Sequence, residues 1–185
     1  KDIKSADGDP NHSGIEFCLD NGIMTGTGAD TFSPDDTITR AQFATMFYRL
    51  AGSPYTDESS QFTDLTQDWY KKPVAWAAAN GILKGAATFS PDDTVTREQI
   101  AAVFYRYAKA KGLDVSNVSS GLDSYNDYSE ISDYAKTAVE WCFDENVMFI
   151  YSVNGYEYAI YPKVAPSRAD TATMFWKFSY ELNNN

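Results

Sequence analysis

A threefold internal repeat is the feature that most constrains how this 185-residue chain folds. The segment NGIMTGTGADTFSPDDTITRAQFATMFYRLAG, which starts at Asn21, closely matches NGILKGAATFSPDDTVTREQIAAVFYRYAKAKG, which starts at Asn80. A weaker third copy, ENVMFIYSVNGYEYAIYPKVAPSRADTATMFWKFSYEL, starts at Glu145. A repeat of this period usually means that one supersecondary unit is stacked several times. The chain is therefore expected to be built from three equivalent units.

The repeats are anchored by Arg40, Arg97 and Arg168, which lie 57 and then 71 residues apart. The longer interval holds a six-residue loop insertion in copy three and an eight-residue longer linker, rich in Ser, Asn, Gly and Asp, over residues 114–127. Copy one is expected to be clipped at its N-terminus, because Lys1-Asp2-Ile3 looks like the remainder of the opening that copy two shows as Phe62-Thr63-Asp64-Leu65. The predicted boundaries are 1–53, 54–112 and 113–185, together forming one structural domain.

Each copy reads as a helix, a turn-rich loop and a second helix. In copy one, Phe43, Met46, Phe47 and Leu50 fall at i, i+3, i+4 and i+7, which places them on one face of a helix. Most of the equivalent positions in copies two and three are also apolar. One unit has little to cover such a stripe, whereas three units can pack their stripes together. The expected fold is all-α, with three helix–loop–helix units about a pseudo-threefold axis.

Capping patterns predict where the helices begin and end. Thr39 and Gln42 form an S/T-x-x-E/Q capping box, so the second helix of copy one is expected to begin directly after Thr39. The first helices of copies one and two are expected to end at Gly22 and Gly81, because glycine suits the left-handed position after a helix. Pro73 is expected in the first turn of its helix.

The capping box places Arg40 at the first helical position, where the helix dipole disfavours a cation. Arg97 and Arg168 repeat this placement. One interpretation is a salt bridge to acids of the preceding loop, such as Asp35 and Asp36, but the loop before Arg168 has no acid. The other is capture of an external anion between the arginine and free backbone N–H groups at the helix N-terminus. The residues alone leave both interpretations open.

Composition argues against several classes of function. A formal net charge of −11 makes a nucleic acid or an anionic membrane an unsuitable partner, because both need a basic surface. No apolar run approaches the roughly 18–20 residues of a membrane-spanning helix. The sequence opens without a signal peptide, so it is expected to be cytosolic or a fragment of a longer exported protein.

Cys18 and Cys142 are the only cysteines, and they occupy matching apolar positions in copies one and three. A structural zinc site is not expected, because the chain has no C-x-x-C pair and only one histidine. Two buried small side chains are the favoured interpretation, and a disulfide stays open because sequence does not give the distance between them.

The repeated motifs resemble those of the S-layer homology (SLH) domain family, present here as three repeats. The family pattern contains G-I-x-x-G, then F-x-P, then I-T-R-A-[EQ]. Copy one supplies Asn21-Gly22-Ile23, Gly26, Phe32, Pro34 and Ile38-Thr39-Arg40-Ala41-Gln42, and copy two supplies Asn80-Gly81-Ile82, Gly85, Phe89, Pro91 and Val95-Thr96-Arg97-Glu98-Gln99.

The resemblance implies non-covalent anchoring of an exported protein to a bacterial cell wall. The implied ligand is a secondary cell-wall polysaccharide that carries a pyruvylated N-acetylmannosamine, held in grooves between neighbouring repeats by the motif arginine. Its carboxylate fits the anion interpretation. The implied ligand-binding residues are Arg40, Arg97, Arg168, Thr39, Thr96, Ser167, Gln42, Gln99, Gly22, Gly26, Gly81 and Gly85, with Trp69 and Tyr134 as sugar-stacking aromatics. No cofactor or metal is implied, and the chain is expected to be a monomer.

Copy three departs from the family pattern. It has Asn146 and Ile150 in place of the glycine pair, and Ser167-Arg168-Ala169-Asp170 in place of T-R-A-[EQ]. Its inserted loop, residues 151–158, would block a groove or reshape it. Arg40 and Arg97 are therefore the strongest expectations.

Three alternative functions follow from other features. A glycosidase needs two carboxylates across a cleft, but the acid pair Asp35-Asp36 falls in a short repeated loop and is expected to be solvated. A calcium loop at Asp7–Asn11 is disfavoured, because His12 stands where glycine is required. The third alternative is a structural S-layer lattice or protein–protein interaction module without a sugar site.

Overall fold

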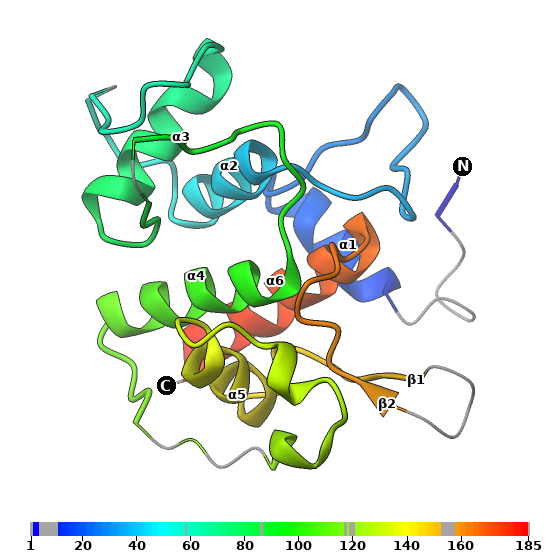
Figure 1. Cartoon of the computed structure of the whole chain (residues 1–185). Helices are drawn as coiled ribbons and strands as arrows, with labels where there is room; N and C mark the ends of the chain where they lie inside the picture. The colour runs from blue at the N-terminus through cyan, green and yellow to red at the C-terminus, as the bar shows by residue number, and fades with distance from the viewer. Residues whose placement is uncertain are drawn as a thin grey trace. The chain divides into compact units, whose positions relative to one another are not determined.

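The computed structural model describes residues 2–3, 11–57, 59–85, 87–116, 118, 121–152 and 158–184. These residues form six α-helices, two single-turn 3₁₀ helices and a sheet of two short strands (Figure 1). The expected all-α class, with little sheet, is confirmed. The arrangement about a pseudo-threefold axis and the predicted domain boundaries stay predictions.

In chain order the helices are α1 (His12–Asp20), α2 (Arg40–Leu50), α3 (Asp68–Ala79), α4 (Arg97–Ala110), α5 (Lys136–Asp144) and α6 (Arg168–Asn184). The 3₁₀ helices are η1 (Leu122–Ser124) and η2 (Tyr128–Glu130), and the antiparallel strands are β1 (Tyr151–Ser152) and β2 (Tyr158–Ala159). The chain divides into two compact units. Unit 1 is Lys1–Val95 with Ser167–Trp176, and unit 2 is Thr96–Pro166 with Lys177–Asn185.

The predicted capping box forms at the start of α2, and α4 begins with the same arrangement. Thr39 Oγ1 accepts a hydrogen bond from Gln42 N at 3.2 Å, and Gln42 Oε1 accepts one from Thr39 N at 2.9 Å. Thr96 and Gln99 make the same reciprocal pair at α4. Each box satisfies backbone groups that a helix start leaves without an intrahelical partner. The predicted starts of α2 and α4 are confirmed.

The predicted helix ends are also correct, but the predicted start of α3 is wrong. Gly22 and Gly81 follow α1 and α3 with φ values of 64° and 69°, in the left-handed region. Pro73 lies in the middle of α3, whose first residue is five positions earlier. The earlier start is stabilised by the fully buried Tyr70, whose hydroxyl accepts a hydrogen bond from Gln67 N at 3.2 Å. Tertiary packing here overrides the local preference of proline.

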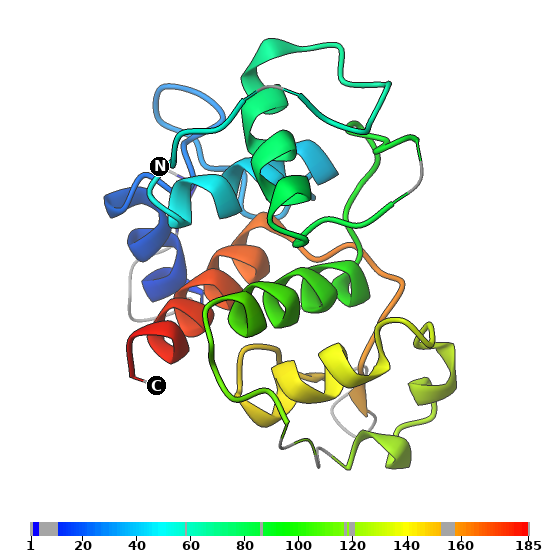
Figure 2. The ribbon, with the colours of Figure 1, turned by 90° about the vertical axis from the view of Figure 1, so that its left-hand side faces the viewer.

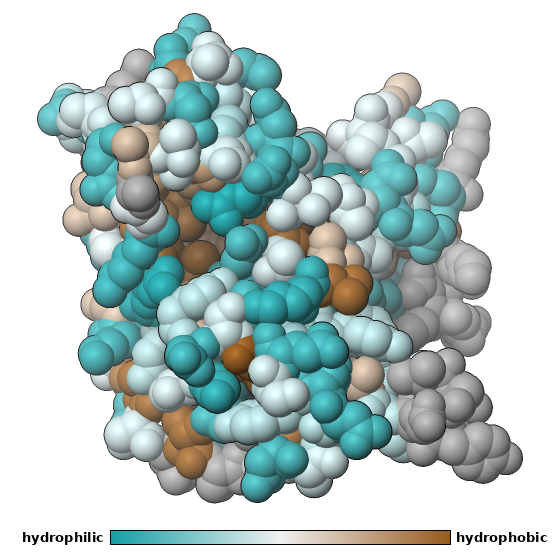
Figure 3. Space-filling view, viewed as in Figure 1, coloured by the Kyte–Doolittle hydropathy of each residue, from teal (hydrophilic) through white to brown (hydrophobic). Residues whose placement is uncertain are grey.

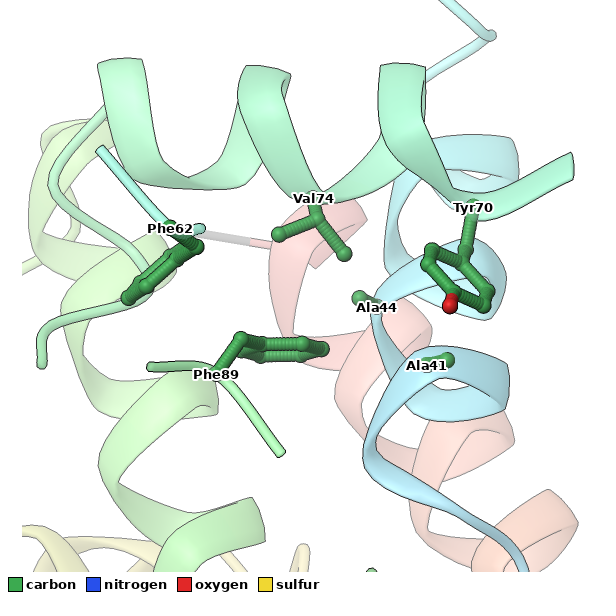
Figure 4. Close-up of a cluster of buried hydrophobic side chains, with 6 residues drawn as sticks. All are labelled: Ala41, Ala44, Phe62, Tyr70, Val74 and Phe89. Atoms are coloured by element: carbon green, nitrogen blue, oxygen red, sulfur yellow. The ribbon is translucent and has the colours of Figure 1, made fainter. Parts of the chain in front are cut away.

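The core of unit 1 includes a cluster between α2 and α3 (Figure 4). Ala41 and Ala44 of α2 face Val74 of α3, and the two helices lie side by side (Figures 1 and 2). Phe62 and Phe89, from loops before and after α3, pack with ring centroids 5.3 Å apart. All five side chains are buried. The small alanines let the backbone of α2 approach α3 closely.

In unit 1, α1 packs against the first half of α6 at very short range. A Cβ added at Gly14 would lie 2.5 Å from the Cα of Thr173. Cys18, one turn further along α1, is fully buried with its Sγ 3.6 Å from Ala172 O. Two small residues on one face of α1 therefore permit this contact.

Unit 2 has a second aromatic core, in which α4 packs against α5. The Phe104 and Phe178 ring centroids are 4.4 Å apart, and those of Trp141 and Phe178 are 6.4 Å apart. Cys142 is fully buried in this unit, and both cysteines are free thiols. Burial raises the pKa of Cys18 to about 12 and also raises that of Cys142. The interpretation of the cysteines as buried small side chains is confirmed.

The face shown in Figure 3 is mostly hydrophilic, with hydrophobic residues in small separate areas. None of the described helices is both long and apolar enough to span a membrane. Among the described residues, no three or more His, Cys, Asp or Glu side chains come together in a way that would hold a metal ion. The calcium-loop interpretation of Asp7–Asn11 falls, apart from Asn11, outside the described residues.

Replacing Gly14 by alanine is expected to destabilise unit 1. At an exposed helical position this change adds about 1 kcal/mol of stability, but here the new Cβ meets the Thr173 backbone. We expect the free energy of unfolding to fall by about 1–3 kcal/mol, as in other overpacked sites, measured by urea denaturation followed by circular dichroism. The control Ser13→Ala, at the exposed preceding position, should change it by less than about 0.5 kcal/mol. A Gly14→Ala variant as stable as wild type would contradict the close approach.

Candidate functional site

The repeated arginine begins each of α2, α4 and α6, and the loop of another copy holds each of these helix starts. Arg168 N donates to Asp36 O at 2.7 Å, and Ala169 N donates to Pro34 O at 3.0 Å. The equivalent hydrogen bonds, at 2.8–3.0 Å, are Arg40 N to Asp93 O and Ala41 N to Pro91 O in unit 1, and Arg97 N to Val164 O and Glu98 N to Pro162 O in unit 2. The start of α6 in copy three therefore holds the loop of copy one. In the same way, the start of α2 in copy one holds the loop of copy two, and the start of α4 in copy two holds the loop of copy three.

The arginine side chain reinforces the same contact. Arg168 Nε donates to Phe32 O at 2.8 Å, and its Nη2 donates to Thr25 O at 2.9 Å. The equivalent bonds are Arg40 Nε to Phe89 O at 2.7 Å, Arg97 Nε to Ile160 O at 2.7 Å and Arg97 Nη2 to Phe149 O at 2.6 Å. Each guanidinium also lies over an aromatic ring of the loop that it contacts. Each arginine therefore binds a loop of its own unit through hydrogen bonds and a ring contact.

These contacts correct two expectations about the arginines. The helix N-termini do not offer free N–H groups to an external anion, because the first two already donate to loop carbonyls. Arg168 also has acids near it, although the loop before it has none: burial lowers its pKa, and the nearby Asp36 and Asp2 of copy one oppose that shift. Sequence reasoning missed both points because the partners come from a distant part of the chain.

A repeated aspartate shapes each loop that receives an arginine. The Asp64 carboxylate accepts hydrogen bonds from Phe89 N at 2.9 Å and Ser90 N at 2.7 Å. Asp2 accepts from Phe32 N and Ser33 N, and Asp127 accepts from Ile160 N and Tyr161 N. Ser90 has a φ of 55°, in the left-handed region that non-glycine residues rarely adopt. The carboxylate stabilises this turn, and Asp127 is the copy-three counterpart that the sequence reading left in the linker.

A groove of about 420 Å³ lies beside Arg168 in unit 1. Its lining comes from the loop after α1, from α2, from the start of α3 and from the start of α6. The lining residues are Ile23, Met24, Thr25, Gly26, Thr27, Gln42, Thr45, Met46, Arg49, Trp69 and Arg168. Its volume falls within the usual range of small-ligand sites, about 300–1,000 Å³.

Four of the predicted binding residues line this groove: Gly26, Gln42, Trp69 and Arg168. Gly26 has no room for a side chain, because a Cβ there would lie 2.7 Å from Thr31 O. The Trp69 side chain is 49% exposed. A cation, an amide and an open aromatic face therefore meet in one place.

The other predicted binding residues do not line this groove. Four of them take part in helix capping (Thr39, Thr96, Ser167 and Gln99), and two follow helix ends (Gly22 and Gly81). Arg40 lies over Phe89, and Arg97 is 1% exposed. Gly85 packs near Phe62, and the Tyr134 hydroxyl donates to Glu98 Oε1 at 3.1 Å. Their part in ligand binding stays a prediction.

Arg49 is a charged lining residue that sequence reasoning missed. It is exposed on α2, and its Nη1 donates to Ile23 O at 3.3 Å. Arg106 and Lys177 occupy the same repeat position, so the repeated cation was an available signal. The groove is thus lined by two arginines and no acidic residue, in a chain whose net charge is −11.

Comparison with known families identifies the repeat. The family model of the S-layer homology domain matches residues 1–44 and 61–101. The chain belongs to the S-layer homology (SLH) domain family. Each matched SLH region ends just beyond its motif arginine, Arg40 or Arg97. Copy three lies outside the matched residues.

Relatives of this SLH chain include enzymes and a surface-layer protein. An endoglucanase of Bacillus sp. (strain KSM-635) is 34% identical over 88% of this chain and 17% of the relative. Exoglucanase XynX of Acetivibrio thermocellus is 28% identical over 92% of this chain and 15% of the relative. The surface-layer 125 kDa protein of Lysinibacillus sphaericus is 27% identical over 87% of this chain and 13% of the relative. The chain thus spans about a sixth or less of each relative's length.

The SLH domain is a cell-wall anchoring module that binds components of the wall. The chain is accordingly an extracellular protein of the cell surface, associated with the cell wall.

Acid is expected to weaken the loop junctions of this SLH chain. Hydrogen bonds from Phe32 and Ser33 lower the pKa of Asp2; at Asp64 burial raises the pKa, but backbone hydrogen bonds and the charge of Arg40 outweigh it. A carboxylate whose pKa is lower in the folded chain stabilises the fold above its unfolded value, about 4, and loses this effect as pH falls through the folded value.

The urea midpoint should therefore fall between about pH 5 and pH 3. Asp64→Ala should lower the midpoint at pH 7 and weaken its dependence on pH in that interval. Asp92→Ala, which removes an exposed acid of the same loop, is the control and should follow wild type. An Asp64→Ala variant with the pH dependence of wild type would rule out this role for the carboxylate.

Proposed function

We propose that the groove beside Arg168 binds an anionic cell-wall carbohydrate and so anchors the chain to the wall. The observation that carries this proposal is charge: the groove has two arginines and no acid in its lining, although the chain has a net charge of −11. A concave site of one sign concentrates ligands of the opposite sign. The ligand class that fits is a secondary cell-wall polysaccharide with a pyruvylated amino sugar, whose ketal carries a carboxylate.

The two arginines have different roles in this proposal. The Arg168 guanidinium is oriented by the carbonyls of Phe32 and Thr25 at 2.8 and 2.9 Å. Arg168 is 7% exposed but lines the groove, and a planar guanidinium held in this way keeps a fixed orientation toward a carboxylate bound there. Arg49 is exposed and reaches the same groove from α2. It supplies a second cation that adjusts to the ligand.

Trp69 offers the face on which a sugar ring stacks. Its Nε1 donates to Gln67 Oε1 at 2.9 Å, and its ring packs edge-on against Tyr70 with centroids 4.8 Å apart. Because these contacts hold the ring, little side-chain entropy is lost when a ligand binds. Thr25, Thr27 and Gln42 add polar groups around this aromatic face. An apolar face surrounded by a few polar groups is typical of a small-ligand site.

For most of the other predicted residues we propose a contact with the polymer elsewhere on the chain. Arg40, Thr39, Thr96, Ser167, Gln99, Gly22, Gly81, Gly85 and Tyr134 would contact the polymer only through grooves other than the one beside Arg168.

We also propose that the chain itself is non-catalytic and monomeric. The enzymes among its relatives match over 8–17% of their own length, so their activities belong to regions that this chain does not cover.

The alternative function is a structural S-layer or protein–protein module without a sugar site. The relatives include an S-layer protein of Bacillus thuringiensis subsp. finitimus, 29% identical over 48% of this chain. This alternative requires no cationic groove. It expects binding to the wall that does not depend on the polysaccharide.

Removing two groove side chains is expected to weaken wall binding. Arg49→Gln and Trp69→Ala each delete an exposed group, so folding should be preserved. We expect the double variant to bind purified wall sacculi at least tenfold more weakly than wild type, about 1.4 kcal/mol or more, in a pull-down titration. Sacculi stripped of their secondary polymer should retain neither protein.

The matched control is Lys109→Gln with Tyr55→Ala. It removes one exposed cation and one aromatic that is 93% exposed, and neither lines the groove. The control should bind like wild type. Equal binding by the groove variant and the control would contradict the proposed site, and undiminished binding to stripped sacculi would favour the structural alternative.

A further inference from the structure

The loop of copy three contacts Arg97 as the loop of copy one contacts Arg168. In both cases the arginine Nη2 donates to the carbonyl at the third position after the helix-ending Gly or Asn. The loop residues that follow are different in size. Residues 25–27 are Thr-Gly-Thr and exposed, whereas residues 149–151 are Phe-Ile-Tyr and half-buried. The space that is open in copy one is therefore the place where copy three has its bulky residues.

Two aromatic rings of copy three cover Arg97. Its Cζ lies 4.6 Å from the Tyr151 ring centroid and 5.6 Å from that of Phe149, and 1% of the residue is exposed. The two rings pack against each other at 5.3 Å, and Tyr151 also pairs with Ala159 in the sheet. These contacts hold the two rings in place over the guanidinium of Arg97.

The second cation position of copy three contacts the same loop. Lys177 occupies the repeat position of Arg49. Its Nζ lies 5.8 Å from the Phe149 ring centroid and 3.2 Å from Asn146 Oδ1. The cations of the groove in unit 1 are Arg168 and Arg49. Their counterparts in unit 2, Arg97 and Lys177, both contact the aromatic loop of copy three.

Unit 2 also supplies its own anion next to Arg97. Glu98 stands where copies one and three have alanine, and it is 4% exposed. Its carboxylate accepts hydrogen bonds from Lys163 Nζ at 2.7 Å and from Ser132 N at 3.0 Å. These bonds attach the end of the copy-three loop to the start of α4. They hold the loop in place without any external ligand.

We propose that Phe149 and Tyr151 occupy the place that a sugar would take beside Arg97, so that Arg97 holds the chain's own loop and not a ligand. This inference rests on the proposed function of the groove beside Arg168. It makes two of the repeated arginines unequal. Arg97, together with Lys177, serves the fold of unit 2, whereas Arg168, together with Arg49, lines the groove proposed to bind the ligand.

Chemical labelling tests the covering of Arg97 without any sugar. Folded protein is treated with phenylglyoxal, which reacts with accessible guanidinium groups, and the modified peptides are quantified by mass spectrometry. Arg49 should react at least tenfold faster than Arg97. In Phe149→Thr with Tyr151→Thr, which gives copy three the threonines of copy one, Arg97 should react at least tenfold faster than in wild type, with Arg49 unchanged. Arg97 reacting as fast as Arg49 in folded wild type would overturn the proposal.

Binding measurements then separate this inference from the proposed function. The probe is the methyl glycoside of pyruvylated N-acetylmannosamine, titrated by calorimetry. Arg97→Lys should lower the thermal midpoint and leave the Kd within twofold of wild type, whereas Arg49→Gln should raise the Kd at least tenfold. Equal losses of affinity in the two variants would overturn the inference. If wild type does not bind the probe, the proposed function fails, and the labelling of wild type still decides whether Arg97 is covered.

Circular dichroism checks that the threonine variant folds. If it does not, the single variant Tyr151→Thr is labelled in its place, since it removes the ring nearest the guanidinium. An Arg97 rate unchanged from wild type in that folded variant would count against the covering ring.

Discussion

Both units depend on the contact between a helix-starting arginine and the loop carbonyls of another copy. A guanidinium has five N–H donors and no acceptor, so its burial is costly unless carbonyl oxygens surround it. Here the side chain and the first two backbone N–H groups of the helix all donate to one loop. An aspartate holds that loop in the left-handed turn that exposes the carbonyls. Helix start, arginine, loop and aspartate therefore form one set of mutually dependent interactions.

The same set of interactions produces different surfaces in different copies. The loop residues next to the arginine are small and exposed at Thr25 to Thr27, and they leave the groove of about 420 Å³. They are large and half-buried at Phe149 to Tyr151, where the rings cover Arg97. Two or three loop positions thus change what the arginine contacts, while the arginine and its carbonyl partners stay the same. Copy three therefore differs in the side chains that fill the space beside the arginine, while the hydrogen bonds between the arginine and the loop carbonyls are the same.

The sequence predicted the features that depend on local pattern. The helical stripes, the capping box at Thr39 and the buried cysteines follow from spacing and residue type, and all are confirmed. The partner of each arginine was not predictable, because it is a backbone carbonyl more than forty residues away and a carbonyl has no residue signature. The sequence pattern therefore favoured Arg40 and Arg97 over Arg168, although the divergent loop of copy three contacts Arg97. The position of Pro73 was also missed, since burial of Tyr70 outweighs a local preference.

If the groove binds an anion as proposed, the carbonyls that hold Arg168 explain how an acidic chain achieves this. Carbonyls are neutral dipoles, so they fix the direction of the guanidinium without removing its charge. A net charge of −11 repels an anionic polymer at long range, but at physiological ionic strength this repulsion is screened beyond about 8–10 Å. The attraction must then come from contacts inside the groove, where fewer water molecules compete and a charge acts more strongly. An arginine already oriented by its loop meets that requirement, because little reorganisation remains to oppose binding.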